Sequence, residues 1–228
     1  MIISGIVKNS FVDYPGLISC VIFVPGCNYD CFYCHNRALI DGTHDLIGST
    51  VLWDFLSRRK GMIDAVVISG GEPTLQPGLP DFLQAVKDLG FLTKLDTNGS
   101  SPQMVSRLLE EGLCDYVAVD YKAPSSRYEE ICGAGADAAS VLDTIRLLLY
   151  NKANFEVRTT LIPQLDEDDL LCMVREVPAV PRYVLNRYRK PERYKPGDES
   201  KITACPRLQC DLIALKSKLN PYQPNLVI

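Results

Sequence analysis

The stretch LISCVIFVPGCNYDCFYCHN, residues 17–36, joins an apolar run to a loop that is rich in cysteine. The run at 17–24 is mostly β-branched or aromatic, which is typical of a strand buried on both faces. The loop after it holds Cys27, Cys31 and Cys34, three of the nine cysteines of the chain. The stretch therefore predicts a buried strand whose carboxyl end carries a cluster of thiols.

The same pattern of an apolar run that ends in polar residues recurs along the chain, with segments of helical pattern between the runs. Two of these helical segments close on Gly90 and Gly112, as helices commonly do. We expect strands at residues 17–24, 64–70, 91–97, 115–122, 155–163 and 182–189. We expect helices at residues 50–59, 79–90, 101–112, 138–152 and 166–177.

This alternation predicts an α/β fold built on a parallel sheet. An open, partial β/α barrel of about six strands is our expectation, and an open doubly wound sheet is the alternative, since periodicity does not separate the two. We expect one domain over 1–228, with a lead-in at 1–16, the barrel at 17–190 and a tail with a helix at 191–228.

Composition narrows the class of protein. The 228 residues are 46% hydrophobic and 23% charged, as in a soluble globular protein. A net charge of −4 argues against a general nucleic-acid binder. No signal peptide or run long enough to span a bilayer is visible, so no membrane role and a cytoplasmic location are expected. In that reducing compartment, clustered cysteines indicate metal or redox chemistry rather than disulfides.

A distinctive polar cluster follows each expected strand. Since parallel strands end at the same edge of a sheet, these clusters are expected to meet at one rim and to assemble a site there. The clusters read GCNYDCFYCHN, SGGEPT, DTNG, DYK, RTT and NRYRK in chain order.

The spacing C-x3-C-x2-C limits the possible metal sites. Structural zinc usually takes four ligands in separated pairs, and His35 stands too close to Cys34 to chelate easily with it. Three simply buried cysteines do not suit a loop of this composition. A 4Fe-4S cluster held by three thiolates would leave one iron open to a cofactor. The spacing favours this last reading.

The motif resembles the signature of the radical S-adenosylmethionine (SAM) superfamily, in which an aromatic residue, here Tyr33, precedes the last cysteine. The resemblance implies that Cys27, Cys31 and Cys34 hold a 4Fe-4S cluster. It implies that the open iron is chelated by the amino and carboxylate groups of S-adenosylmethionine. The reduced cluster would then cleave this cofactor to a 5′-deoxyadenosyl radical, without a catalytic acid or base from the protein.

SGGEPTL (69–75) resembles the element of that superfamily that holds the amino group of the cofactor. Two glycines allow close approach of the backbone to a ligand, and a carboxylate accepts from an ammonium group. A plain Gly–Gly turn is the alternative. The residues expected here are Gly70, Gly71 and Glu72.

Further cofactor contacts are expected at the ends of the third, fourth and fifth strands, since similar positions in activating enzymes of glycyl-radical enzymes contact the cofactor. Arg158 lies within an apolar strand, so it is expected to meet an anion, either the cofactor carboxylate or an acid of the same rim. The residues carried over by the resemblance are Asp96, Asn98, Asp120, Lys122 and Arg158.

The sixth strand departs from part of that family. Some activating enzymes carry a histidine near its end, whereas this chain reads LNRYRKPERYK, so Asn186 or a neighbour would replace it in contacts to the cofactor. The basic residues of this segment could dock an acidic partner, although a solvated charged face is the more common explanation. They are Arg187, Arg189, Lys190, Arg193 and Lys195.

The unit NSFVDYPGLISCVIFVPGCNYDCFYCHN (9–36) resembles the activating enzymes of glycyl-radical enzymes, above all those of anaerobic ribonucleoside-triphosphate reductase. The resemblance implies hydrogen abstraction from a backbone glycine of that partner and an electron from flavodoxin or ferredoxin. A small-molecule enzyme such as 7-carboxy-7-deazaguanine synthase is one alternative. A non-catalytic iron–sulfur protein is another, although it would need no cofactor cradle. Cys205 and Cys210 are expected to be ordinary cysteines.

Overall fold

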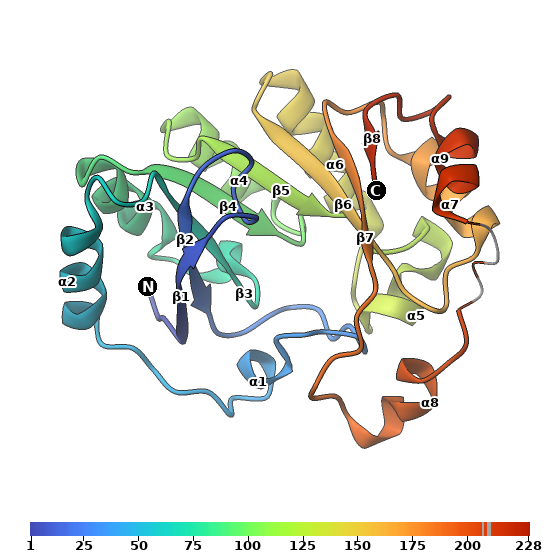
Figure 1. The fold of residues 1–228 in the computed structure, drawn as a ribbon, viewed down its shortest axis with the longest axis horizontal. Coiled ribbons are helices and arrows are strands. Elements are labelled where there is room, and N and C mark those ends of the chain that lie inside the picture. Colours follow the sequence, from blue (N-terminus) through green and yellow to red (C-terminus); the bar gives the residue numbers. More distant parts are fainter. Residues whose placement is uncertain (207, 209–210) are drawn as a thin grey trace. The chain divides into compact units, whose positions relative to one another are not determined.

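The structure is a computed structural model that describes residues 1–206, 208 and 211–228. Its sheet contains eight strands whose order in space follows their order in the chain (Figure 1). The strands are β1 (Gly5–Ser10), β2 (Ser19–Val24), β3 (Ala65–Gly70), β4 (Leu92–Thr97), β5 (Tyr116–Asp120), β6 (Phe155–Leu161), β7 (Tyr183–Arg187) and β8 (Leu226–Val227).

The sheet is mostly parallel and is not closed. β2 pairs in parallel with β3, β3 with β4, β6 with β7 and β7 with β8, while β1 runs antiparallel to β2. The expectation of an α/β fold on an open parallel sheet is confirmed, and the six expected strands correspond to β2–β7. The sequence analysis did not assign β1, which lies in the expected lead-in, or β8, which has only two residues.

All five expected helices are present as α2, α3, α4, α6 and α7, and shorter helical segments occur in the loops. The helices are α1 (Arg37–Ile40), α2 (Ser49–Arg59), α3 (Leu79–Asp88), α4 (Pro102–Glu110), α5 (Tyr128–Cys132), α6 (Ala138–Tyr150), α7 (Glu167–Glu176), α8 (Glu199–Ile202) and α9 (Leu212–Leu219). The 3-10 segments are η1 (Pro73–Leu75), η2 (Ser125–Arg127) and η3 (Pro196–Asp198). Among the described residues, no helix is long and apolar enough to cross a membrane.

The chain divides into two compact units. Unit 1 comprises Met1–Asn28, Ala38–Thr97 and Gln103–Ala118, and unit 2 comprises Tyr29–Arg37, Asn98–Pro102 and Val119–Ile228. The cysteine motif is divided between them, because Cys27 belongs to unit 1 while Cys31 and Cys34 belong to unit 2. Each unit is described separately below.

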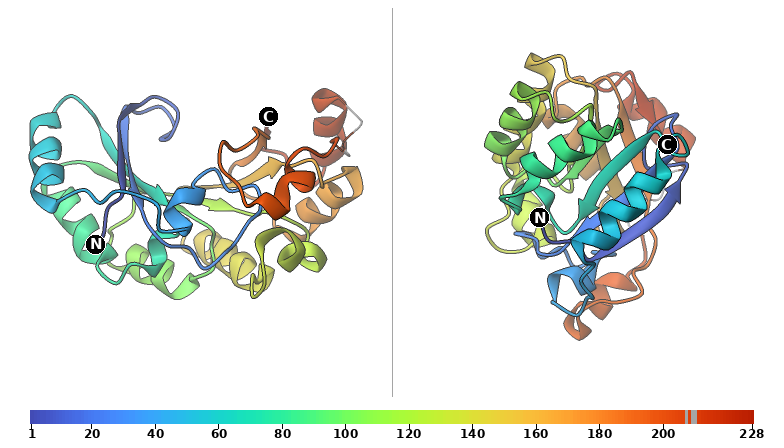
Figure 2. Two further views of the ribbon diagram at one scale, coloured as in Figure 1. Left: turned by 90° about the horizontal axis from the view of Figure 1, so that it is seen from below. Right: turned by 90° about the vertical axis from the view of Figure 1, so that its left-hand side faces the viewer.

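The core of unit 1 lies between its parallel strands and their helices. The β3 run Val66–Val67–Ile68 is fully buried, which is why the strand is apolar at successive positions and not at alternate ones. Figure 2 shows α3 and α4 on one side of the strands of this unit. α3 buries Phe82 and Leu83 there, and the ring of Phe82 lies 5.2 Å from that of Trp53 on α2.

The core of unit 2 packs α6 and α7 with β6 and β7. α6 buries Val141, Ile145 and Leu148, three positions at helical spacing. α7 begins with a capping box in which Asp166 and Asp169 each accept from the backbone N–H of the other. β6 and β7 align Thr160 with Asn186, so their carboxyl ends lie together.

Candidate functional site

In unit 1 the backbone links the ends of β2 and β3 directly. The amide of Gly71 donates to the carbonyl of Val24 over 2.8 Å, and the amide of Glu72 donates to the carbonyl of Gly26 over 2.7 Å. A Cβ at position 71 would lie 1.9 Å from the carbonyl oxygen of Gly26. Only glycine therefore fits at position 71, and the GGEP element holds the start of the cysteine loop through its backbone.

The carboxylate of Glu72 is fully buried and firmly held. Its Oε1 accepts from the backbone amide of Thr74 over 3.0 Å and from its hydroxyl over 2.6 Å, and from the hydroxyl of Thr97 over 2.7 Å. Thr97 ends β4, so Glu72 connects the ends of β3 and β4. The sequence analysis did not assign Thr74 or Thr97. The sequence did contain a signal for them, because each threonine lies within two residues of an acidic residue, Glu72 or Asp96.

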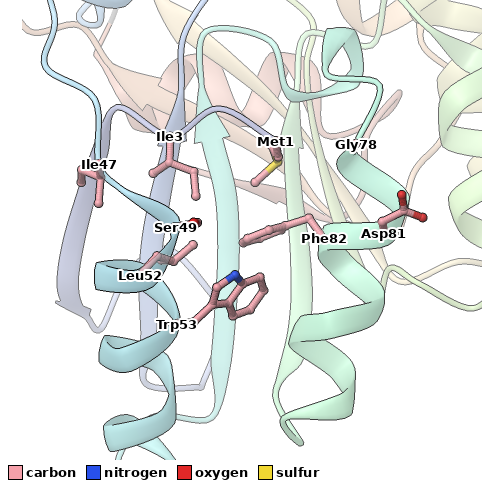
Figure 3. A pocket seen from close by; sticks show the side chains of 9 residues that line it. All are labelled: Met1, Ile3, Ile47, Ser49, Leu52, Trp53, Gly78, Asp81 and Phe82. Carbon is pink, nitrogen blue, oxygen red and sulfur yellow. The ribbon is translucent and has the colours of Figure 1, made fainter.

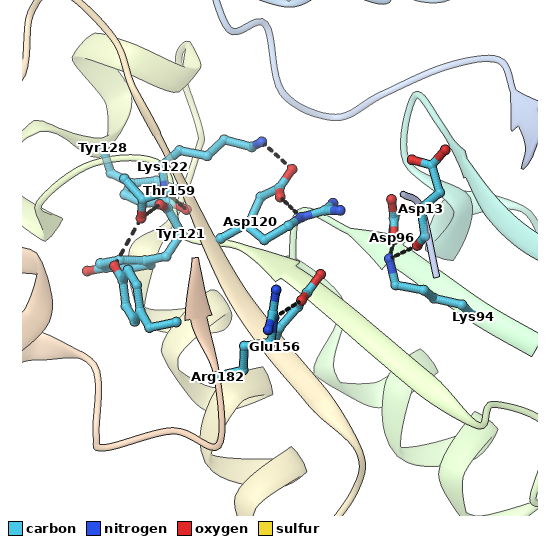
Figure 4. Close-up of polar contacts among 12 residues, drawn as sticks. Asp13, Lys94, Asp96, Asp120, Tyr121, Lys122, Tyr128, Glu156, Thr159 and Arg182 are labelled. Carbon is cyan, nitrogen blue, oxygen red and sulfur yellow. Dashed lines mark hydrogen bonds and ion pairs between the residues drawn. The ribbon is translucent and has the colours of Figure 1, made fainter. Parts of the chain in front are cut away.

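Asp96 is paired with a buried lysine. Lys94 is only 1% exposed, and its Nζ donates to Asp96 Oδ1 over 2.8 Å and to the carbonyl of Asp13 over 2.6 Å (Figure 4). The lead-in loop is thereby fixed to β4. Lys94 was missed in the sequence, although it interrupts an apolar strand in the same way as Arg158 does.

In unit 2, the expected residues Asp120, Lys122 and Arg158 form one ionic group. Asp120 Oδ2 accepts from Lys122 Nζ over 3.0 Å, and Asp120 Oδ1 accepts from Arg158 Nε over 3.0 Å (Figure 4). The exposed fractions of the side chains are 33%, 16% and 19%, respectively. Two cationic side chains thus meet on the carboxylate that ends β5.

The same ion pairs shift the pKa values of Asp120 and Lys122. Burial by itself would raise the pKa of Asp120, but the charges of Lys122 and Arg158 outweigh it and lower that pKa well below its ordinary value. Burial would lower the pKa of Lys122, but Asp120 raises it well above its ordinary value. Asp120 and Lys122 therefore each favour their charged form.

Neighbouring polar side chains hold the ends of β5 and β6 in place. The hydroxyl of Thr159 donates to the carbonyl of Tyr121 over 2.7 Å, and the hydroxyl of Tyr128 accepts from the amide of Lys122 over 3.4 Å. The buried carboxylate of Glu156 accepts from Arg182 over 3.0 Å (Figure 4). Tyr121, Lys122 and Thr159 lie in the DYK and RTT clusters, but the sequence analysis did not assign these contacts because the partners lie on different elements.

The cysteine loop of unit 2 forms a tight turn. The amide of Cys34 donates to the carbonyl of Cys31 over 3.1 Å, and the side chains of Cys31 and Tyr33 are buried. Asp30 accepts from the buried Arg37 over 2.6 Å and also from Lys195. One member of the expected basic run, Lys195, therefore fixes the segment before α8 to the cysteine loop.

Both thiols of this turn are protonated in the metal-free chain. A hydrogen bond with the thiol of Cys132, together with burial, raises the pKa of Cys31 well above its ordinary value. Burial also raises the pKa of Cys34. Because metals bind the thiolate, metal binding at these residues has to displace the protons.

The remaining expected residues lie as follows. Asn98 is buried, and its side-chain oxygen accepts from the amide of Ser100 over 2.9 Å. Asn186 is exposed on β7 and lines a cavity of about 560 Å³ together with Arg187 and Arg189. His35 is also exposed. Cys205 is exposed, whereas Cys210 lies outside the described residues.

A second cavity, of about 270 Å³, opens in unit 1 between α2, α3 and the start of the chain (Figure 3). None of the expected site residues lines it. The cavity is mostly apolar, and Ser49 and Asp81 are the polar side chains drawn around it. Its lining residues are Met1, Ile3, Ile47, Ser49, Leu52, Trp53, Gly78, Asp81 and Phe82.

Comparison with protein families gives a match to the model described as the radical SAM superfamily over residues 21–177. This match covers more than half of the chain and includes the cysteine loop, the GGEP element and the ends of β4, β5 and β6. The chain belongs to the radical SAM superfamily. The family implies a 4Fe-4S cluster and S-adenosylmethionine.

Similar proteins include a protein of Methanocaldococcus jannaschii that is named as a glycyl-radical enzyme activating enzyme. It is 34% identical over 233 aligned residues, covering 100% of this chain and 95% of its own length. The pyruvate formate-lyase-activating enzyme of Clostridium pasteurianum is 35% identical, over 58% of each chain. The 7-carboxy-7-deazaguanine synthase of Neisseria meningitidis is 34% identical, over 51% of this chain and 50% of its own.

Two solved structures share the fold. The structure of TYW1 with a lysine–pyruvate adduct bound has a TM-score of 0.59 at 21% identity, covering 90% of this chain and 73% of that one. SuiB of Streptococcus suis bound to S-adenosylmethionine has a TM-score of 0.62 at 17% identity, covering 89% and 47%. At these identities the likeness concerns the fold alone.

The residues of the chain fit the implied cofactors by their chemistry. Thiolates are the usual ligands of iron–sulfur clusters. In unit 2 the ammonium of Lys122 and the guanidinium of Arg158 are groups that bind carboxylates. Among the described residues, no three His, Cys, Asp or Glu side chains stand together as a ready metal site.

We predict that Gly71→Ala destabilises the protein strongly, because the new Cβ would overlap the carbonyl of Gly26 in the backbone. The expected loss in the free energy of unfolding is at least about 2 kcal/mol, measured by chemical denaturation. Gly197→Ala is the matched control, since nothing lies within 4 Å of its Cβ, and it should change stability by less than about 0.5 kcal/mol. Equal stabilities of the two variants would contradict the close approach.

We predict that Asp120 contributes to stability at neutral pH but not in acid. Since its pKa is lowered on folding, its contribution is present above the ordinary value of about 3.9 and is lost as the pH falls below it. Asp120→Asn should cost about 1–3 kcal/mol at pH 7 in the metal-free protein, and the difference from the wild type should shrink towards pH 3. Asp143→Asn is the control, since its pair with Arg146 is exposed. A difference for Asp120→Asn that is independent of pH would refute the prediction.

Proposed function

We propose that this protein is a radical SAM activating enzyme that generates the glycyl radical of a partner enzyme. The observation that carries the proposal is the similarity to a protein named as such an enzyme, which extends over 100% of this chain and 95% of that relative. Similarity to a pyruvate formate-lyase-activating enzyme supports the same class. The proposed partner is anaerobic ribonucleoside-triphosphate reductase, on the resemblance of residues 9–36.

In this proposal the cluster is held by Cys27, Cys31 and Cys34. When bound, the cluster and S-adenosylmethionine would supply the radical chemistry that removes a hydrogen atom from a backbone glycine of the partner. The protein itself supplies no acid or base, so its work is to bind, to orient and to exclude water.

The GGEP element would orient the amino end of the cofactor. Thr74 and Thr97 hold Oε1 of Glu72, so the carboxylate has a fixed direction before the ligand arrives. Gly70 and Gly71 lie against the backbones of Val24 and Gly26, which fixes the position of Glu72. The buried carboxylate of Glu72 would accept a charge-assisted hydrogen bond from an ammonium group placed beside it.

The ionic group of unit 2 would receive the acidic end of the cofactor and its ribose. Lys122 and Arg158 both donate to Asp120, and ammonium and guanidinium groups form strong charge-assisted hydrogen bonds with carboxylates. Asp120 remains ionised and can accept from a hydroxyl. Tyr33, Asp96, Asn98 and Asn186 are proposed to complete the cofactor site. Reduction by flavodoxin or ferredoxin in the reducing cytoplasm would supply the electron.

A small-molecule radical SAM enzyme is the second candidate, because the chain is also 34% identical to a 7-carboxy-7-deazaguanine synthase. That similarity covers only about half of each protein, namely 51% and 50%. The similarity to the protein named as an activating enzyme extends over the whole chain, and we therefore prefer that function.

The first test is cleavage of the cofactor. Anaerobically reconstituted protein should hold about four irons per chain and, once reduced, should release 5′-deoxyadenosine from S-adenosylmethionine. Cys31→Ala and Cys34→Ala should release none, whereas Cys172→Ala, an exposed cysteine on α7, should match the wild type. Wild-type protein that binds zinc and no iron would refute the radical chemistry.

The second test concerns the partner. Incubation of the reduced protein and S-adenosylmethionine with anaerobic ribonucleoside-triphosphate reductase should give the EPR doublet of a glycyl radical on that enzyme. Substitution of the radical-bearing glycine of the partner by alanine should abolish the doublet. Cofactor cleavage without a doublet on this or any other glycyl-radical enzyme of the host would favour the small-molecule candidate.

A further inference from the structure

The outer edge of the sheet in unit 1 borders a cavity. β1 stands first in the strand order, and among the described residues it pairs with β2 alone (Figure 1). An edge strand directs part of its backbone N–H and C=O groups outward, where a further strand can bind them. Beside this edge lies a cavity of about 610 Å³, lined by Ile6 and Lys8 of β1 and by residues of α2. We call this cavity the β1 groove.

The chain itself makes one bond of the added-strand kind just before β1. The amide of Ser4 donates to the carbonyl of Phe23 over 2.8 Å, toward β2, and the amide of Ile47 donates to the carbonyl of Ile3 over 2.8 Å. The C=O and N–H of one trans peptide point in opposite directions, so the carbonyl of Ile3 points away from β2. Ile47 thus meets the outer edge as an added strand would. The chain then leaves the edge, because α2 begins at Ser49.

One part of the β1 groove is apolar. Ile6 comes from β1, Ile47 precedes α2, and Val51 and Phe55 lie at helical spacing on α2. Val51 is 63% exposed, so apolar surface is open to solvent here. The volume of the cavity lies in the range of sites that hold ligands.

The other part of the β1 groove is cationic. Lys8 comes from β1, and Arg58 and Arg59 come from the last turn of α2. The guanidinium of Arg59 lies 5.3 Å from the centre of the Phe55 ring, a cation–π contact that joins the two parts of the lining. Among the described residues that line the groove, Asp54 is the acidic one. An anionic side chain is therefore favoured beside the apolar part.

We propose that the β1 groove is the docking site of an extended segment of a partner protein, which adds to β1 as a strand. Side chains at every second position of this segment would face the groove, and they would be apolar and acidic. Backbone hydrogen bonds to β1 would hold the segment, and the lining of the groove would select its side chains.

Charge favours such a partner over a second copy of this chain. β1 has the sequence GIVKNS and contains no acidic residue. Pairing of two β1 strands would bring a second Lys8 to a groove that already holds three cations. A lysine on an edge strand opposes pairing between identical strands, and the same charge attracts an acidic strand. The groove contains none of the expected cluster or cofactor residues, so the inference is independent of the proposed function.

The test uses a synthetic peptide of about eight residues, with threonine at every second position and isoleucines followed by glutamates between them. Its reversed sequence covers the opposite strand direction. Added to isotope-labelled full-length protein, a glutamate peptide should shift the NMR amide signals of Gly5–Ser10 and α2 and slow hydrogen exchange in β1. The same peptide with lysine for glutamate should bind at least about tenfold more weakly.

Variants test the charge of the groove. Arg58→Glu changes an exposed side chain and should weaken binding of the glutamate peptide about threefold to tenfold. Lys216→Glu is the matched control, since it removes an exposed cation from α9, outside the groove, and it should leave the affinity unchanged. Amide spectra of both variants report whether they are folded.

Several results would overturn the proposal. Failure of both glutamate peptides to bind would do so, as would amide shifts that lie outside β1 and α2. Equal affinities for the glutamate and lysine peptides, or for the wild type and a folded Arg58→Glu, would also contradict it. Shifts of β1 amides that depend on protein concentration without peptide would instead make a second copy the occupant.

Discussion

The close approach of Gly71 to Gly26 is the constraint on which the rest of unit 1 depends. The two backbones are joined by the hydrogen bond from Glu72 to Gly26, and a Cβ at position 71 would stand 1.9 Å from a carbonyl oxygen. This contact places the GGEP element against the first turn of the cysteine loop. It also delivers the carboxylate of Glu72 to Thr97 at the end of β4, so three successive strand ends are tied by backbone and buried side-chain bonds. A ligand site formed by such bonds is rigid before any ligand binds.

In unit 2 the expected site residues are held together by ionic contacts. Asp120 meets both Lys122 and Arg158, and the attraction outweighs the cost of burying the carboxylate. The ammonium of Lys122 and the guanidinium of Arg158 are groups that bind anions. Asp30 repeats the arrangement on the surface of the cysteine loop, where Arg37 and Lys195 meet the same carboxylate. Lys94, Arg158 and Asp30 thus each form an ion pair with a residue of the same or a neighbouring segment.

Much of this arrangement could be predicted from residue order alone. Residues 65–68 are apolar at every position because β3 is fully buried there, and such runs separate buried parallel strands from the rest of the chain. Motif spacing pointed to the thiols, to Glu72 and to the ionic group. β1 and β8 were not predicted, because β1 is half exposed and β8 has two residues. Lys94 was overlooked although it interrupts an apolar run, since its partners are Asp96 and a backbone carbonyl that no pattern identifies.

The sequence by itself determined the class of fold, the superfamily and the residue types of the site, because periodicity and motif spacing are local properties of the chain. Only the tertiary structure decided which side chains meet. It paired Asp120 with Arg158, bonded Glu72 to Thr97 and joined Asp30 to Cys132, and each of these pairs joins different elements. Contacts of this kind depend on strand register and on how closely two backbones approach. The sequence of a single element determines neither of these.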